Sequence, residues 1–152
     1  MEIEGFENYI IYRDGSIKSK ARRGTPERVL KACDNGKGYL MVRMTDCDGR
    51  RHTKYPHRLV AEHYIPNPDN KREVDHIDRN PHNNDITNLR WVTPSENSQN
   101  KGVSKNNKLG VKNIQKMRNV YRVRKMIDGK NYYKSFKTLE EAIVYREDIQ
   151  ER

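Results

Sequence analysis

The stretch from residue 73 to residue 97 constrains the fold most strongly, because it predicts a complete supersecondary unit. Glu73–Ile77 is a short strand-like run that leads into turn-forming Asp and Asn residues. After a polar loop, the aromatic and β-branched run Leu89–Val92 predicts a second strand. Thr93 and Glu96 have the spacing of a capping box, so we expect a helix to follow directly.

Three polar side chains of different chemistry should converge on this unit. Asp75 and His76 end the first strand, and Asn97 lies in the first turn of the helix. Taken singly, each has an ordinary explanation, since Asp and Asn are common at turns and a histidine can be a buried polar group. As an ordered set, an acid, an imidazole and a carboxamide favour a catalytic site.

These residues resemble the HNH nuclease family, in the form found in phage and intron-encoded homing endonucleases. The matching residues, in chain order, are Asp75–Asp78, Asn83, Asn84, Asn88–Thr93 and Asn97. The resemblance implies a strand–strand–helix unit that holds one divalent metal ion. It makes His76 the first signature residue, Asn88 the middle one and Asn97 the last, and it implies that Asp75 is a metal ligand.

The chemistry of phosphodiester hydrolysis fits these residue types. A neutral imidazole such as that of His76 can take the proton from an attacking water. A hard cation held by Asp75 and the side-chain oxygen of Asn97 can stabilise the leaving oxygen. Mg²⁺ needs few protein ligands for this, and Mn²⁺ can replace it. Asn88 would hold the hairpin or the imidazole in place.

Two features of this sequence differ from what some proteins of that family have. Arg79 stands where relatives often have glycine, and if this turn requires a positive φ angle, Asn80 would have to supply it. Some HNH relatives carry zinc. Cys33 and Cys47 cannot form a four-cysteine site, and the sequence has no CxxC motif, so we expect no zinc here.

Composition limits the partners. The chain has 152 residues, 34% of them charged and 33% hydrophobic, which favours several small units over one large core. Its net charge of +10 favours a polyanionic partner, although binding to a ribosome or a membrane surface could also explain it. Residues 101–152 hold 14 basic and 6 acidic side chains, so DNA affinity should come mainly from this segment. No apolar run approaches the length of a spanning helix, and we expect neither a signal peptide nor membrane association.

The N-terminal third predicts short strands. Asp14 and Gly15 are a hairpin turn signal between two of them, and residues 39–44 and 50–55 form a second pair around a further turn. Five basic residues between positions 18 and 28 could track a DNA backbone or could be a solvated loop. Pro56 begins a helix that extends to about Tyr64, and within it Arg58 could face a phosphate. Residues 57–61 resemble a string found just before HNH units, with His57 expected to be a packing or hydrogen-bonding residue.

The last part of the chain predicts a sheet packed on one helix. Its strand-like and turn-forming segments are Leu109–Val111, Val120–Arg124 and Tyr132–Phe136, with Gly129 and Lys130 between the last two. Thr138 and Glu141 form a second capping box, which begins a helix that extends to about residue 149. In a strand, alternation places Arg122 and Arg124 on one face, opposite Tyr121 and Val123.

This part resembles the three-stranded DNA-binding domain of plant ethylene-response factors. The matching residues are Gly110, Val111, Tyr121, Gly129, Lys130, Phe136, Thr138, Glu140–Ala142 and Tyr145, while the family's tryptophans are absent. The resemblance implies that the sheet lies in the DNA major groove. It also places Tyr132 and Lys134 near the family's DNA contacts, together with Arg122 and Arg124.

The sequence therefore predicts an α+β protein built of small modules. They are an N-terminal β-rich module (1–55), a ββα-metal unit with its preceding helix (56–100), a basic linker (101–108) and a DNA-binding domain (109–152). We expect a monomeric, Mg²⁺-dependent endonuclease of the homing type that acts on double-stranded DNA without a small-molecule cofactor. It would be phage-encoded and act in the cytoplasm of a bacterial host cell. The alternatives are a DNA-binding protein with an inactive nuclease unit and a basic RNA- or ribosome-binding protein.

Overall fold

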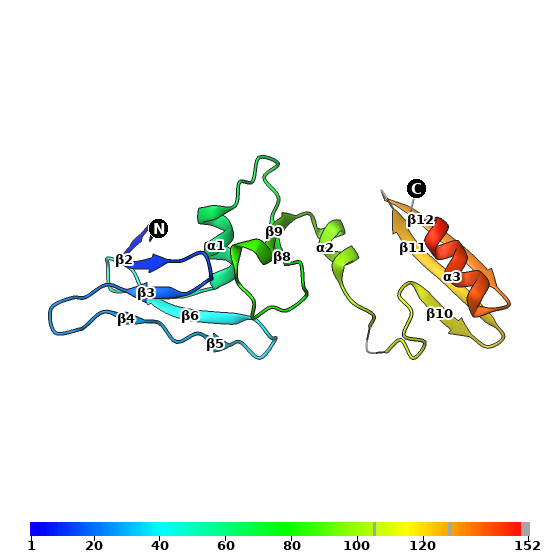
Figure 1. Ribbon diagram of the computed structural model, residues 1–152, viewed down its shortest axis with the longest axis horizontal. Helices are drawn as coiled ribbons and strands as arrows, with labels where there is room; N and C mark the ends of the chain where they lie inside the picture. The colour runs from blue at the N-terminus through cyan, green and yellow to red at the C-terminus, as the bar shows by residue number, and fades with distance from the viewer. Residues whose placement is uncertain (105, 128, 150–152) are drawn as a thin grey trace. The chain divides into compact units, whose positions relative to one another are not determined.

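The computed structural model describes residues 1–104, 106–127 and 129–149, and it has the predicted α+β architecture of small antiparallel sheets and helices (Figure 1). The chain forms two compact units, residues 1–101 and 102–152. Each unit has a hydrophobic core of its own. Within the described residues, no helix is long and apolar enough to cross a membrane. The narrower module boundaries expected from the sequence remain predictions.

The first unit opens with two antiparallel sheets. The four-stranded sheet has the order β1 (Glu2–Ile3), β2 (Phe6–Ile11), β3 (Ile17–Ser19) and β4 (Arg28–Val29). The three-stranded sheet consists of β5 (Cys33–Asp34), β6 (Leu40–Thr45) and β7 (Arg51–Lys54). Both hairpins expected from the sequence are present, and Gly15 and Gly49 adopt positive φ angles of 83° and 81° in their turns.

The rest of the first unit follows the predicted element order. It comprises α1 (Pro56–Tyr64), β8 (Glu73–His76), a 3₁₀ turn η1 (Ile86–Asn88), β9 (Leu89–Val92) and α2 (Pro94–Asn100). The capping box is confirmed, since the Glu96 N–H donates to the Thr93 hydroxyl and the Thr93 N–H donates to the Glu96 carboxylate. One core joins these elements to the N-terminal sheets through Ile11, Val60 and Leu89. The hairpin β8–β9 is therefore braced by the N-terminal strands.

The second unit is a three-stranded antiparallel sheet packed on one helix, as predicted. Its elements are β10 (Ile114–Met117), β11 (Val120–Ile127), β12 (Lys130–Phe136) and α3 (Leu139–Asp148). Ile114, Val123, Ala142 and Ile149 form the core, and Thr138 and Glu141 complete the second capping box. The sequence did not single out β10, because only Ile114 of this strand is buried and the rest of its side chains are exposed.

Candidate active site

The hairpin β8–β9 places the two leading candidates at a buried strand end. In the antiparallel register, Asp75 lies opposite Arg90 and His76 lies opposite Leu89. Asp75 is 7% exposed and His76 is 5% exposed. An acid and an imidazole that are both buried need polar partners, because burial without hydrogen bonds is costly. Their partners come from α2, from β9 and from the loop between the two strands.

His76 is oriented by the loop. Its Nε2 lies 3.1 Å from Oδ1 of Asn84, which is itself 5% exposed. An amide oxygen can only accept, so Nε2 carries the proton and the neutral ring keeps its lone pair on Nδ1. The ring also lies against His57 at 5.2 Å and Tyr39 at 6.2 Å between centroids.

The position next to the candidate base is occupied by His57 of α1. This ring is 8% exposed, and its Nδ1 has no hydrogen-bond partner among the described residues. Burial, together with the neighbouring His76 and Arg58, lowers the pKa of His57 to about 4. His57 is therefore neutral at physiological pH. The sequence indicated a packing role for it but not its contact with His76.

Asn88 ties the loop to the hairpin. Its Oδ1 accepts from the Asp78 N–H at 3.0 Å, and its Nδ2 donates to Asp78 Oδ1 at 2.9 Å and to the Asn83 carbonyl at 2.8 Å. This geometry supports the prediction that Asn88 holds the hairpin. The expectation for the turn was wrong: Arg79 itself has the positive φ angle, 63°, and Asn80 is not among the residues with one. Tight hydrogen bonding around Asp78 holds the turn in this conformation.

The Asp75 carboxylate accepts hydrogen bonds from two side chains, Arg90 and Asn100. Arg90 Nε and Nη2 donate to Asp75 Oδ2 at 3.0 and 2.7 Å. Asn100 Nδ2 lies 3.0 and 2.9 Å from the two carboxylate oxygens and also donates to the His76 carbonyl. The predicted ligand Asn97 instead donates to Glu73 at 2.6 Å. Asn100 and not Asn97 is therefore the α2 side chain that touches Asp75.

The donor set fits a hard divalent ion. No group of three or more His, Cys, Asp or Glu side chains that could hold a metal ion occurs within the described residues. The candidate site offers one buried carboxylate, Asp75, beside the Asn100 carboxamide of α2 and the half-exposed Arg90 side chain. A cation that takes few protein ligands and completes its shell with water and phosphate oxygens suits such a site, whereas zinc prefers four nitrogen or sulfur ligands.

The turn of the N-terminal hairpin β2–β3 packs against the loop that orients His76. Gly15 has no space for a side chain, since a Cβ atom there would lie 2.5 Å from the Asn84 Cβ. In addition, the Ile86 N–H donates to the Arg13 carbonyl at 2.8 Å. The turn of residues 12–16 therefore fixes the backbone on both sides of Asp85, next to Asn84.

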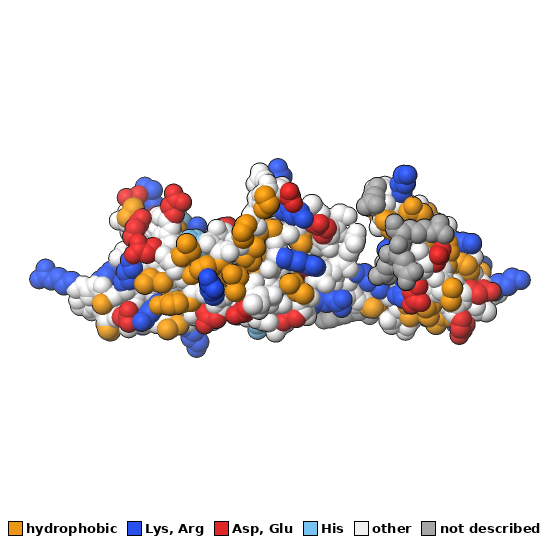
Figure 2. Space-filling model, turned by 45° about the horizontal axis from the view of Figure 1, so that its top comes forward, with side chains coloured by type: hydrophobic (Ala, Val, Ile, Leu, Met, Phe, Trp, Pro, Cys, Tyr) orange, Lys and Arg blue, Asp and Glu red, His pale blue; other side chains and the backbone are white. Residues whose placement is uncertain are grey.

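The second unit presents a basic sheet face. Arg122 lies opposite Ser135 and Arg124 opposite Tyr133, so all four point to the side away from the core residue Val123. The Arg124 guanidinium lies 5.6 Å from the centroid of the Tyr133 ring. An open groove of about 850 Å³ runs along this face, lined in part by Gln115, Arg122, Arg124 and Tyr133. Lys and Arg side chains appear on the surfaces of both units (Figure 2).

Three other predicted DNA contacts lie elsewhere. Register places Tyr132 and Lys134 on the helix side of the sheet, where Tyr132 packs against the core and Lys134 lies 4.9 Å from the Tyr145 ring. Arg58 donates to the Arg72 carbonyl at 2.9 Å and lies 4.0 Å from Glu62. The structure thus groups Arg122 and Arg124 on one sheet face and places Tyr132 and Lys134 on the opposite face, while Arg58 belongs to the first unit.

Comparison with known proteins points to one family. Residues 54–99 match a protein-family model described as HNH endonuclease. An uncharacterised HNH endonuclease of Acanthamoeba polyphaga mimivirus is 40% identical over 97 residues, which cover 64% of this chain and 28% of the viral protein. A second mimiviral HNH endonuclease is 37% identical over 99 residues, 24% of its length. The chain thus spans about a quarter of these two relatives.

A relative of known structure covers more of the chain. The DNA endonuclease I-HmuI of Bacillus phage SP01 is 37% identical over 101 residues, which cover 65% of this chain and 55% of that protein. A solved structure, described as DNA binding and cleavage by the HNH homing endonuclease I-HmuI, aligns with a TM-score of 0.59 and 28% identity. It covers 95% of this chain and 81% of the other. None of these comparisons tests the resemblance of residues 109–152 to ethylene-response factors, which stays a prediction.

Proposed function

We propose that this protein is a metal-dependent DNA endonuclease of the homing type, because residues 54–99 match the HNH endonuclease family and the chain is similar to I-HmuI. It would hydrolyse phosphodiester bonds in double-stranded DNA and leave 5′-phosphate and 3′-hydroxyl ends. The observation that carries the proposal is the buried pair at the end of β8. There, His76 is oriented by Asn84 and directly follows the buried Asp75 in the chain.

In this proposal His76 is the general base. Asn84 fixes the neutral tautomer in which Nδ1 has the lone pair, so Nδ1 receives the proton of the attacking water. The His57 ring beside it stays uncharged, so no imidazolium lies next to His76 to act as an acid. Asn88 positions the loop through its three hydrogen bonds and thereby holds Asn84 close to the imidazole.

Asp75 would hold the divalent ion, with Asn97 as the ligand inferred from the family pattern and Asn100 as the carboxamide that already touches Asp75. When bound, Mg²⁺ or Mn²⁺ would neutralise charge on the phosphate and stabilise the leaving oxygen. The chain's own contribution is to hold the carboxylate in one orientation. Arg90 and Asn100 do this through four short donor–acceptor distances.

The partner in this proposal is double-stranded DNA, bound by a monomer. The net charge of +10 and the basic face of Arg122 and Arg124 support it. We propose that this face anchors the protein on its site, as the resemblance to ethylene-response factors implies. Cleavage and anchoring would then belong to separate units of the chain, since residues 1–101 contain the candidate active site and 102–152 the basic sheet.

The test is incubation of the purified protein with the genomic DNA that flanks its own gene, with Mg²⁺ or with EDTA. We expect cutting in Mg²⁺, none in EDTA, retained DNA binding in both, and products that a ligase can rejoin. A protein that binds this DNA but leaves it intact with Mg²⁺ and with Mn²⁺ would support the alternative, a DNA-binding protein whose nuclease unit only docks. Stoichiometric zinc in the purified protein would contradict the proposed metal.

A further inference from the structure

The Asp75 carboxylate has a resident cation partner. Arg90 Nε and Nη2 both donate to the same oxygen, Oδ2, at 3.0 and 2.7 Å. A guanidinium that binds a carboxylate with full strength makes two parallel hydrogen bonds, one to each oxygen. Here the second oxygen, Oδ1, has Asn100 Nδ2 as its partner at 3.0 Å, and the same nitrogen lies 2.9 Å from Oδ2. The arginine is therefore held at one oxygen only.

The two members of the pair differ in exposure. The Asp75 side chain is 8% exposed, whereas the Arg90 side chain is 47% exposed. A buried carboxylate needs a counter-charge, so Arg90 stabilises Asp75 as long as no other cation is present. Because nearly half of the arginine already faces solvent, it can leave Asp75 with a small loss of packing.

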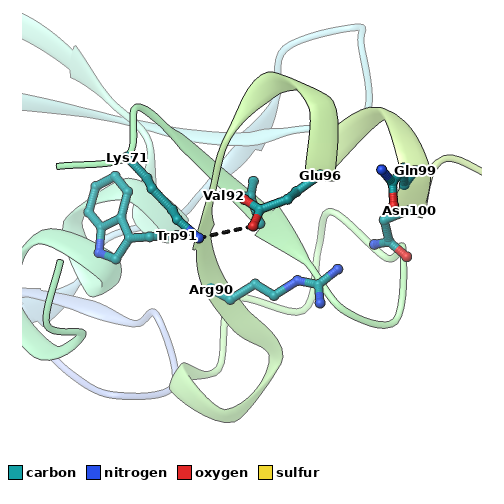
Figure 3. A pocket seen from close by; sticks show the side chains of 7 residues that line it. All are labelled: Lys71, Arg90, Trp91, Val92, Glu96, Gln99 and Asn100. Atoms are coloured by element: carbon teal, nitrogen blue, oxygen red, sulfur yellow. Dashed lines mark hydrogen bonds and ion pairs between the residues drawn. The ribbon is translucent and has the colours of Figure 1, made fainter. Parts of the chain in front are cut away.

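Arg90 lies in a pocket that could hold it after release. The pocket, about 500 Å³ and open to solvent, is lined by Lys71, Arg90, Trp91, Val92, Glu96, Gln99 and Asn100. Figure 3 shows the Arg90 side chain extending across it toward Asn100, while Lys71 is paired with Glu96 at 3.0 Å. A freed guanidinium in this place would have two or more N–H groups directed at an incoming phosphate, which its planar geometry matches.

Asp75 Oδ2 already accepts from both Arg90 nitrogens, so a divalent ion at this oxygen would compete with the guanidinium for its lone pairs, and the two cations repel each other. We infer that Arg90 is the resident counter-ion of Asp75 in the metal-free protein, that a divalent ion displaces it, and that the released side chain binds a phosphate of the DNA. The phosphate part rests on the proposed function. The displacement part concerns the protein without DNA.

The displacement is measured as Mn²⁺ affinity of the full chain without DNA, by electron paramagnetic resonance of free Mn²⁺. Arg90→Met should bind Mn²⁺ more tightly by about threefold or more. This factor corresponds to the free energy that a half-exposed ion pair typically contributes. Arg72→Met, which removes an exposed positive charge three residues before Asp75, is the control for net charge and should stay within about a factor of two of the parent. Equal or weaker binding by Arg90→Met, or no Mn²⁺ binding by either protein, would overturn the displacement.

Arg90→Met leaves Asp75 without its counter-charge and can unfold the hairpin, so the parent protein supplies a second measurement. In ¹H–¹⁵N spectra, the Arg90 Nε–H resonance, assigned by its loss in Arg90→Lys, should shift on Mg²⁺ addition in step with the Asp75 signals. An Arg90 resonance that stays unchanged at saturating Mg²⁺ would overturn the displacement.

The phosphate contact is measured with DNA. At saturating Mg²⁺, Arg90→Met should cleave about tenfold more slowly than the parent in single turnover, since a charge-assisted phosphate contact is lost. A rate equal to that of the parent would overturn the phosphate contact while leaving the displacement intact. If the parent itself cuts no DNA, the proposed function fails, and the Mn²⁺ measurement still decides the displacement on its own.

Discussion

Nε2 of His76 lies 3.1 Å from Oδ1 of Asn84, and this contact decides which ring nitrogen can act as a base. The carboxamide oxygen accepts the Nε2 proton, so the lone pair is on Nδ1. The loop between β8 and β9 therefore supplies more than a connection: it sets the tautomer of the candidate base.

Replacing Asn84 should show this role. Asn84→Leu removes the acceptor, and we expect single-turnover cleavage to fall by about tenfold to a hundredfold with little change in DNA affinity. Asn84→Asp keeps an acceptor and adds a charge that stabilises the protonated imidazole. Its rate should fall less, and the acidic limb of its pH–rate profile should move to higher pH. A pH–rate profile of Asn84→Asp that equals that of the parent would contradict this role and would leave Asn84 with a packing role only.

Gly15 and Gly49 form a matched pair for testing the link between the N-terminal hairpin and the site. Both have positive φ angles, but only at Gly15 would a Cβ atom collide with Asn84, while nothing lies within 4 Å at Gly49. Each alanine substitution should lower the free energy of unfolding by about 1 kcal/mol through backbone strain. Gly15→Ala should lower it further and should also slow cleavage. If Gly15→Ala and Gly49→Ala lower the free energy of unfolding and the cleavage rate by the same amounts, the proposed link between Gly15 and Asn84 would be contradicted.

His57 predicts a pH dependence of stability. Its pKa is about 4 in the folded protein against 6.5 in the unfolded chain, so the unfolded chain binds the extra proton between these values. The stabilising contribution is complete above pH 6.5 and is lost as the pH falls toward 4. Between pH 6.5 and pH 5 we expect a loss of about 2 kcal/mol in the free energy of unfolding.

His57→Phe keeps a ring in the same place and cannot titrate. Its urea unfolding curve should therefore change less than that of the parent between pH 6.5 and pH 5, a range in which most carboxylates remain ionised. Parallel pH dependence of the two proteins would show that the loss arises from another group.

Local sequence patterns predicted the local structure well. Both capping boxes, the ends of α1 and the pairing of β8 with β9 follow from propensity, proline position and turn chemistry, which act over a few residues. The position of Asp75 and His76 at the end of β8 follows from the same reasoning. The contact between Arg90 and Asp75 could also have been predicted, because the register of the hairpin places the two residues opposite each other.

Contacts between segments that are distant in the sequence could not be predicted from such local patterns. The packing of His57 on His76 depends on how α1 docks on the hairpin, and the choice of Asn100 over Asn97 depends on the angle of α2. The positive φ of Arg79 is another example, since hydrogen bonds around Asp78 outweigh the intrinsic preference of an arginine. Such features follow from tertiary packing rather than from local pattern.

The basic face of the second unit should set the target preference. Arg122→Gln and Arg124→Gln should each reduce discrimination between cognate and random DNA by about 1–3 kcal/mol if the arginine reads a guanine. Lys116→Gln, on the helix side of the sheet beside Tyr121, is the charge-matched control and should weaken both DNAs alike. Gel-shift competition at fixed salt measures the ratio.

Truncation after Lys101 extends this test. The first unit has its own core, so the shortened protein should remain folded but lose most of the preference for its site. If the truncated protein keeps the same ratio of cognate to random binding, the specific contacts lie in the first unit, and the basic residues between positions 18 and 28 become the candidates.

The central claim is that His76 activates the attacking water. The most direct measurement is single-turnover cleavage of the cognate DNA by the parent and by His76→Ala, at saturating Mg²⁺ and at protein concentrations where both bind all of the DNA. We predict a loss of at least about 10²-fold in rate with near-normal binding, because general base catalysis typically contributes that much. Equal cleavage rates for the two proteins would contradict the claim.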